Sequence, residues 1–170
     1  VATTDGLFKM AIETAVGQLD LDRVGILMLD RSREFMQGTW GTDDQGNIHS
    51  ETDMIAPIDE NVKKVIAQLQ NRGEVCVWRN TDLYGFDKEG MSSKMGNGWN
   101  AAVGLWHNEI LVGWIACDNL LNHEPFQVFQ SHILRLFASI ISAYRSRILA
   151  QEDLSTLNVE LERKVAERTS

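Results

Sequence analysis

The sequence predicts an α+β fold, in which helices flank a central antiparallel sheet of about six strands and a long C-terminal helix extends into a parallel coiled coil. Apolar residues recur at helical spacing near both ends of the chain and once in its middle. Between these segments lie short apolar runs separated by turns, without the regular strand–helix alternation of a parallel sheet. After Pro125 the chain contains no further proline or glycine, so nothing there breaks a helix.

The composition is typical of one small folded domain with an extension. A chain of 170 residues, 44% hydrophobic and 24% charged, can bury a core of ordinary size. The formal net charge of −8 argues against binding to nucleic acid or to an anionic membrane surface, because both depend on lysine and arginine. The sequence also lacks the ~18 consecutive apolar residues that a membrane-spanning helix needs. We therefore expect neither nucleic acid nor membrane contact for this chain.

The first part of the chain predicts one helix followed by two strands. Apolar residues fall on one side of a helix that Asp5 can cap and that ends at Leu19. Residues 23–30 have apolar or small side chains on both faces, which is typical of a central strand. A second strand is expected over 34–42, and it leads into the turn sequence DDQGN.

This turn has a superficial likeness to a calcium-binding loop. In such a loop, oxygen ligands alternate around a glycine at the sixth position. If Gly46 takes that position, the first ligand position falls on Gly41, which has no side chain. We therefore predict a hairpin turn here and not a metal site.

The middle of the chain predicts a short strand, a helix and another short strand. Residues 51–57 are expected to form an edge strand. Asp59 can cap a helix that Gly73 stops, and a further strand is expected over 74–80. The next segment, 81–97, has three glycines and no firm periodicity. We expect it to be a long functional loop with at most one helical turn, since loops of this length often cover binding sites.

Residues 98–119 predict a hairpin of two apolar strands. The tight turn is expected at His107-Asn108, because asparagine tolerates the positive φ that such turns need. Apolar residues occupy both faces of the second strand, so we place it inside the sheet. A loop follows, and then the long helix.

The last quarter of the chain predicts a single helix that leaves its own domain. From Phe126 to Ile148 the apolar residues form a broad stripe, as in a helix packed against a domain. After Gln151 the stripe narrows to a heptad seam with Asn158 at an a position, which favours a paired, in-register dimer. At about 1.5 Å per residue the helix would be roughly 70 Å long. The residues expected at the interface of a parallel homodimer are Ile141, Tyr144, Ile148, Leu154, Asn158, Leu161 and Val165.

Two stretches resemble known families. The run LNVELERKVAERT, which ends at Thr169, resembles the signalling helix, a parallel coiled-coil connector between sensor and output domains. The hairpin GLWHNEILVGWIACDN, the loop NHEPF and the helix beginning FQVFQSHILRLFASIISAY resemble the end of a GAF domain, with Gly113 as the glycine of the second strand. The resemblance implies a GAF/PAS-like sensory domain over residues 1–148 and a signalling-helix linker over 149–170, leading to a missing output domain.

The resemblance implies either a small-molecule site between the sheet and the loops on one face, or a module that only dimerises. The cyclic-nucleotide pattern is not reproduced, because Thr81 follows Asn80 where that branch has a lysine. Neither Cys76 nor Cys117 lies in the Cys-His context of bilin-linked phytochromes. The histidines are not paired at the spacing of haem or iron ligands. The ligand and any cofactor are therefore unknown from the sequence.

The side chains around segment 81–97 predict where a ligand would bind. They combine aromatic, flexible and cationic groups, which suit a small, flat or anionic molecule in a mostly apolar pocket. Arg79 and Tyr84 are the foremost candidates, Asn119 is a further one, and Trp114 has at least an equal claim to the core. The predicted ligand-binding residues are Trp78, Arg79, Tyr84, Phe86, Met95, Trp99, Trp114 and Asp118.

The sequence predicts no catalytic function for this chain and no metal site. It shows no nucleophile–base pair, phosphate-binding loop or catalytic carboxylate pair. Two cysteines form no recognisable framework, so we interpret them as inert buried thiols, which favours a reducing cytoplasm. A methionine-sulfoxide reductase on a GAF scaffold would need several reactive cysteines in loops.

The chain begins Val-Ala-Thr-Thr, with neither an initiator methionine nor a signal peptide, so we expect a fragment of a longer protein. The expected parent is a sensor histidine kinase, with a diguanylate cyclase or an HD-type phosphodiesterase as the alternative. A ligand would shift a dimer between states, and the helix would relay the change. The competing hypothesis is a ligand-free dimerisation module. A polar cavity near Arg79 would favour the sensor, and a segment 81–97 collapsed onto packed tryptophans would favour the module.

Overall fold

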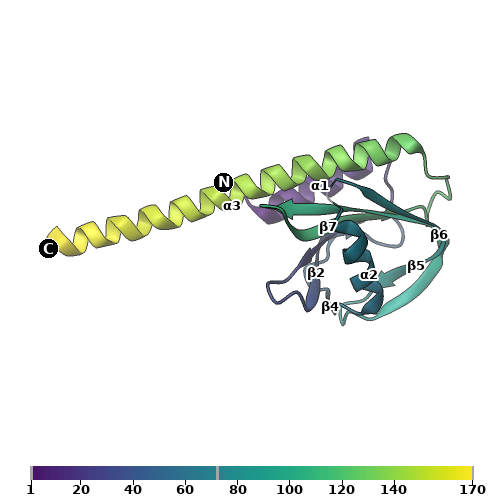
Figure 1. Ribbon diagram of the computed structural model, residues 1–170, viewed down its shortest axis with the longest axis horizontal. Coiled ribbons are helices and arrows are strands. Elements are labelled where there is room, and N and C mark those ends of the chain that lie inside the picture. Colours follow the sequence, from purple (N-terminus) through teal and green to yellow (C-terminus); the bar gives the residue numbers. More distant parts are fainter. Residues whose placement is uncertain (1, 72, 170) are drawn as a thin grey trace.

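The computed structural model, which describes residues 2–71 and 73–169, has the predicted α+β architecture. Seven antiparallel strands form one sheet in the order β3-β2-β1-β7-β6-β5, with β4 also paired to β2. Figure 1 shows helices on both faces of this sheet and one long helix projecting away from it. The elements are α1 (Thr4–Gln18), β1 (Val24–Leu29), β2 (Phe35–Thr42), β3 (Ile48–Ser50), β4 (Ile55–Pro57), α2 (Glu60–Leu69), β5 (Val75–Phe86), β6 (Ser92–His107), β7 (Ile110–Asp118) and α3 (Val128–Thr169).

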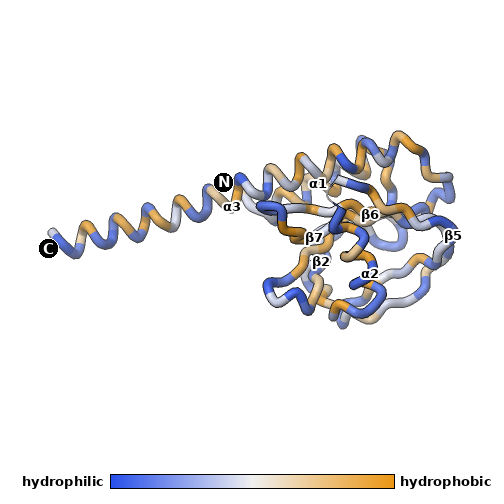
Figure 2. The backbone as a smooth tube through the Cα atoms, in the orientation of Figure 1, coloured by the Kyte–Doolittle hydropathy of each residue, from blue (hydrophilic) through white to orange (hydrophobic). Residues whose placement is uncertain are grey.

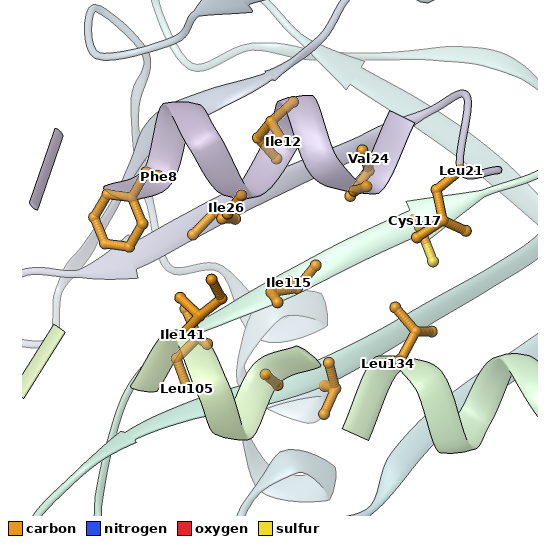
Figure 3. Packing of buried hydrophobic residues seen from close by; sticks show 14 of the residues in the cluster. Phe8, Ile12, Leu21, Val24, Ile26, Leu105, Ile115, Cys117, Leu134 and Ile141 are labelled. Atoms are coloured by element: carbon orange, nitrogen blue, oxygen red, sulfur yellow. The ribbon is translucent and has the colours of Figure 1, made fainter. Parts of the chain in front are cut away.

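The larger core lies between the sheet and the pair of helices α1 and α3. Ile12 of α1, Ile26 of β1 and Leu105 of β6 are fully buried in it. Figure 3 shows these side chains directed into one apolar layer with Leu134 and Ile141 of α3. Because an interior of this kind is close-packed, α3 is held firmly along its first half.

A second, smaller core lies on the opposite face of the sheet, beneath α2. Met36 of β2, Leu111 and Trp114 of β7, and Leu69 of α2 belong to it. α2 begins as predicted, because the Asp59 carboxylate accepts a hydrogen bond from the Val62 N–H at 2.9 Å. Both faces of the central strands are thus covered, which explains their apolar residues on both faces.

The start of α1 differs from the prediction. Thr3, and not Asp5, is the N-cap residue, and its hydroxyl accepts a hydrogen bond from the Gly6 N–H at 3.0 Å. Asp5 instead accepts a hydrogen bond from the Trp40 indole N–H at 2.9 Å. An N-cap threonine satisfies an otherwise unpaired helix donor just as aspartate does, so the sequence alone did not distinguish the two.

Segment 81–97 is not the loop that we predicted. β5 continues to Phe86 and β6 begins at Ser92, so the segment is the distal half of a long β-hairpin. The turn is closed by Asp87, whose carboxylate accepts hydrogen bonds from the N–H groups of Glu89 and Met91. Gly90 has a φ of +79°, which glycine adopts without strain.

The next turn is displaced by one residue from its predicted place. Asn108 and Glu109 have φ values of +49° and +67°, as the two central residues of a type I′ turn require. β6 therefore continues through His107, which pairs with Ile110. The expected edge strand 51–57 is also shorter and occupies only Ile55–Pro57.

The long helix is confirmed, although it begins at Val128 and not at Phe126. It runs for 42 residues without interruption. Its second half projects beyond the domain, and Figure 2 shows hydrophobic and hydrophilic segments alternating along it. Among the described helices, none is long and apolar enough to cross a membrane.

Candidate functional site

The distal half of the β5–β6 hairpin, residues 81–97, is called here the distal hairpin. The carbonyl oxygen of Tyr84 accepts a hydrogen bond of 2.7 Å from Nη2 of Arg23, the residue just before β1. At the tip, a Cβ on Gly90 would lie 2.5 Å from the Ile55 carbonyl oxygen and 2.9 Å from Ala56 Cα, in β4. Since β4 and β5 lie at opposite edges of the sheet, the distal hairpin crosses the face that α2 also covers.

A group of charged side chains lies beneath the distal hairpin, and we call Arg23, Glu51 and Asp118 the charged cluster. Arg23 Nε is 3.6 Å from Asp118 Oδ2, and their side chains are only 13% and 11% exposed. Glu51 Oε1 is 3.2 Å from Nε2 of the half-exposed His49. Most ion pairs on protein surfaces are well solvated, so this degree of burial separates the cluster from ordinary surface charges.

Two glycines, Gly38 and Gly41, make room for Glu51 on the sheet. A Cβ on Gly41 would lie 2.7 Å from Glu51 Oε1, and one on Gly38 would lie 2.5 Å from the Glu51 carbonyl oxygen. A Cβ on Gly25, the partner of Gly41 across β1 and β2, would lie 3.7 Å from Oε2 of the same carboxylate, which is an ordinary van der Waals distance. Glycine in a strand often marks a close approach by another group. The sheet is therefore shaped to receive this carboxylate.

Burial dominates the electrostatics of the charged cluster. Loss of water raises the pKa of the Asp118 carboxyl, and the Arg23 guanidinium opposes that rise only in part. Burial likewise raises the pKa of the Glu51 carboxyl against the opposing effect of His49. Arg23 Nη1 and Asp22 Oδ1 are buried and have no hydrogen-bond partner among the described residues. Buried polar groups are rarely left without a hydrogen-bond partner, so these two atoms are unusual for a folded domain.

The structure does not bring the predicted ligand-binding residues into one pocket. Trp99 belongs to the core beneath α1 and α3, whereas Trp114 and Trp78 belong to the core on the other face. The Arg79 guanidinium carbon lies 5.8 Å from the centre of the Phe126 ring, away from the charged cluster. Tyr84, Phe86 and Met95 are exposed side chains of the distal hairpin. Of the eight predicted residues, only Asp118 contributes its side chain to the charged cluster.

Arg23 and Glu51 were missed by the sequence analysis. Arg23 precedes an apolar strand and Glu51 lies in a short connection, positions at which charged residues are ordinary. The available signal was the set of glycines inside two predicted strands, at Gly25, Gly38 and Gly41. Such glycines indicate that something packs closely on the sheet, but they do not identify it.

A separate groove of about 440 Å³ lies between α3 and the end of β6. Ser142 Oγ accepts a hydrogen bond from the Trp106 N–H at 3.1 Å, and Ser146 Oγ is 3.0 Å from His107 Nδ1. These contacts tie α3 to the sheet. The groove is lined largely by small residues and lies on the face opposite the charged cluster.

The helix residues predicted for dimerisation fall into two groups. Ile141 and Ile148 are 4% and 6% exposed because they pack in the core of their own domain, so they are not free to meet a partner. Tyr144, Leu154, Leu161 and Val165 are each at least half exposed. Five residues of the projecting half line one shallow hollow, and four of them are spaced as i, i+3, i+4 and i+7, which is the arrangement of a hole in knobs-into-holes packing. These four are Asn158, Leu161, Glu162 and Val165, and the fifth is Ala166.

The described residues contain no group of three or more histidine, cysteine or acidic side chains placed to hold a metal ion. Cys117 is buried and Cys76 partly buried, and both are free thiols. Burial raises the pKa of each thiol, which makes both poor nucleophiles.

Comparison with known proteins identifies the fold. No family model matches the sequence, and no curated protein matches it. Among solved structures, residues 122 to 287 of a methyl-accepting chemotaxis protein align with a TM-score of 0.64 and 19% identity, over 86% of this chain and 90% of that one. The second GAF domain of DevS from Mycobacterium smegmatis aligns with a TM-score of 0.62 and 13% identity, over 89% and 99%. A GAF domain/HD domain protein from Geobacter sulfurreducens aligns with a TM-score of 0.61 and 12% identity, over 86% and 94%.

The chain therefore has the fold of a GAF domain, continued by a long C-terminal helix. This confirms the fold that the hairpin and helix at 98–148 suggested. At these identities the likeness is one of structure alone, and function has to be argued from the residues of this chain.

Proposed function

We propose that this chain is a sensory domain of a signal-transduction protein, which binds a small ligand beneath the distal hairpin and relays the change through α3. The observation that supports this most is the dual role of α3. Its first half is buried against the sheet at Leu134 and Ala138, and its second half is exposed beyond Ile148. A rigid helix that belongs to the core at one end and to solvent at the other is suited to transmit a movement of the domain.

The charged cluster is the proposed ligand site. Arg23 offers a buried Nη1 without a partner among the described residues, and it is already fixed by Asp118 and the Tyr84 carbonyl. A ligand with a hydrogen-bond acceptor would satisfy this donor. The binding free energy would come from giving a hydrogen-bond partner to Arg23 Nη1, because a buried donor without a partner lowers stability.

The proposed assembly is a parallel homodimer along α3, in the cytoplasm. The exposed apolar residues of the first half lie on the side away from the core, and they continue into the heptad seam. They are Phe129, Leu136, Ile140 and Tyr144, followed by Leu154, Leu161 and Val165. Asn158 would set the register of the pair.

For the output domain we propose a histidine kinase first. An HD-type phosphodiesterase is the alternative favoured by the likeness to a GAF domain/HD domain protein, and a diguanylate cyclase is a further one. The chain itself would not be catalytic. The competing hypothesis is a dimerisation module without a ligand, since such a module would dimerise through the same heptad seam.

Mass spectrometry of the purified chain under native and denaturing conditions tests the proposal. We expect a dimer that has extra mass only under native conditions, and loss of the adduct in Arg23→Ala. Lys94→Gln, at an exposed ion pair on the distal hairpin, is the control and should keep the adduct. A dimer without adduct, also after incubation with metabolite mixtures, would favour the dimerisation module. A monomer would contradict the assembly.

A further inference from the structure

Two routes of direct contact join the distal hairpin to the segment that leads into α3. The first route passes through Arg23, which donates a hydrogen bond to the Tyr84 carbonyl and pairs with Asp118. The Asp118 carboxylate in turn accepts a hydrogen bond from the Leu120 N–H at 3.1 Å. A shift of the hairpin at Tyr84 therefore acts on the connection that follows β7.

The second route is a pair of close approaches at glycines of β6. A Cβ on Gly96 would lie 2.6 Å from Leu120 Cδ1, and one on Gly98 would overlap Asn119 Oδ1. The connection after β7 thus packs directly against the hairpin backbone. Gly96 is one of the three glycines that made segment 81–97 look like a loop, and its close contact with Leu120 gives a physical reason for it.

The second route continues through Asn119 and Trp99 to the carbonyl oxygen of Glu124. Asn119 is 7% exposed, and its carbonyl Oδ1 accepts a hydrogen bond from the Trp99 N–H at 2.8 Å. The Asn119 amide and the Trp99 indole N–H both donate to the Glu124 carbonyl, at 2.9 and 2.8 Å. The Trp99 ring also meets the Phe126 ring edge to face, at 4.9 Å. Glu124 and Phe126 lie in the connection that leads into α3.

We propose that the distal hairpin and the entry of α3, residues 119–126, form one coupled unit, so that displacement of the hairpin from the charged cluster shifts the start of α3. This inference rests on the proposed function, because it assigns the route by which occupancy of the site reaches the helix. It makes Arg23, Trp99 and Asn119 positioning residues for the signal. Coupling of this kind is reciprocal, so loosening either end must loosen the other.

Hydrogen–deuterium exchange of the ligand-free chain tests the coupling from both ends. Asp118→Asn removes the ion pair with Arg23 but keeps the size of the side chain. Trp99→Phe removes the indole N–H bound to Glu124 but keeps an aromatic ring. We expect each variant to speed exchange about fivefold in both segments, 81–97 and 126–134. Peptides of α1 should not change.

Lys94→Gln is the matched control, since it removes an exposed ion pair with Asp82 on the same hairpin. It should leave exchange in α3 unaltered. The coupling is overturned if Asp118→Asn loosens the hairpin while the start of α3 stays protected, or if Trp99→Phe loosens α3 alone. It is also overturned if exchange rises equally in α1, because that would be general destabilisation. A failure to find a ligand by mass spectrometry would count against the proposed function. The exchange experiment would still test the coupling, because it uses the ligand-free chain.

Discussion

At the scale of single residues, the most informative feature is a set of charges that folding removes from water. Glu51 and Asp118 are carboxylates in a region where burial raises the pKa of both. The positive charge of Arg23 offsets this loss of hydration only in part, so the two ionised carboxylates lower the stability of the folded domain. Groups that are unfavourable for stability are often retained for function, which is consistent with the proposed ligand site.

The pH dependence of stability should reveal this cost. A carboxyl whose pKa is raised by folding binds its proton more tightly in the folded state, so it destabilises the fold at pH values above the folded-state pKa. The cost disappears as the pH falls through that value, which for Glu51 lies above the ordinary 4.5. Glu51→Gln should therefore be more stable than the wild-type chain at neutral pH. The advantage should vanish in acid, as measured by urea unfolding across this range.

Asp82 provides a control, because folding shifts the pKa of its carboxyl in the opposite direction to that of Glu51. Its hydrogen bonds to Lys94 and Asn97 lower the pKa of its exposed carboxyl. Asp82→Asn should therefore lose stability at neutral pH and not in acid. If Glu51→Gln also loses stability at neutral pH and not in acid, the ionised Glu51 carboxylate does not destabilise the fold as we infer.

Two glycines offer a direct test of close packing against conformational freedom. A Cβ at Gly98 would overlap Asn119 Oδ1, whereas one at Gly17, in α1, would meet nothing within 4 Å. Gly98→Ala should cost about 1–3 kcal/mol of unfolding free energy through overpacking. Gly17→Ala should gain about 0.5–1 kcal/mol, because alanine is the better helix former. Chemical denaturation measures both, and equal effects at the two sites would contradict the packing at Asn119.

At the scale of elements, α3 combines two different environments in one helix. In its first half, one side packs in the core and the other is exposed, as residues Ile140 and Ile141 illustrate. Ile141 is 4% exposed and Ile140 is 43% exposed. The apolar stripe that the sequence shows is wide because it serves both sides.

These neighbouring residues should respond differently to the same substitution. Ile141→Ala deletes buried methyl groups and should cost about 2–5 kcal/mol of unfolding free energy. Ile140→Ala removes an exposed side chain and should change monomer stability by no more than about 0.5 kcal/mol. Thermal or urea unfolding at low protein concentration separates the two. A large loss at Ile140 would mean that the helix is rotated relative to the sheet.

At the scale of the whole molecule, the projecting half of α3 has no core of its own. Isolated helices are marginally stable in water unless their apolar face is packed. Leu154, Leu161 and Val165 are exposed on this segment. Self-association along the seam would bury them, which is the physical argument for the proposed dimer.

The seam can be tested with two substitutions on the same helix. Leu161→Asp introduces a charge at a d position and should raise the dissociation constant about 100-fold or more, as expected for a central interface residue. Val159→Asp changes another exposed apolar residue, which is at a b position outside the seam, and should leave the dimer intact. Analytical ultracentrifugation gives both constants. Dissociation by both variants, or by neither, would contradict the heptad register.

Local sequence patterns determined most of the elements of this fold. The strands near β1, β2 and β7, the capped helix α2 and the uninterrupted α3 follow from periodicity, capping residues and the absence of helix breakers. These signals depend on residues close to one another in the chain. The order of elements was enough to suggest the GAF fold.

Only the tertiary structure decided the distal hairpin and the charged cluster. Residues 81–97 have weak local preferences, and they become strands because Gly90 fits against Ala56 and Gly96 against Leu120. Arg23, Glu51 and Asp118 are far apart in the sequence and meet because β1 pairs with both β2 and β7. Likewise, burial on one side of α3 took Ile141 and Ile148 out of the predicted seam. Local sequence preferences do not predict the distal hairpin, the charged cluster or the burial on one side of α3. Each of these depends on contacts between residues far apart in the sequence, and such contacts exist only once the sheet has formed.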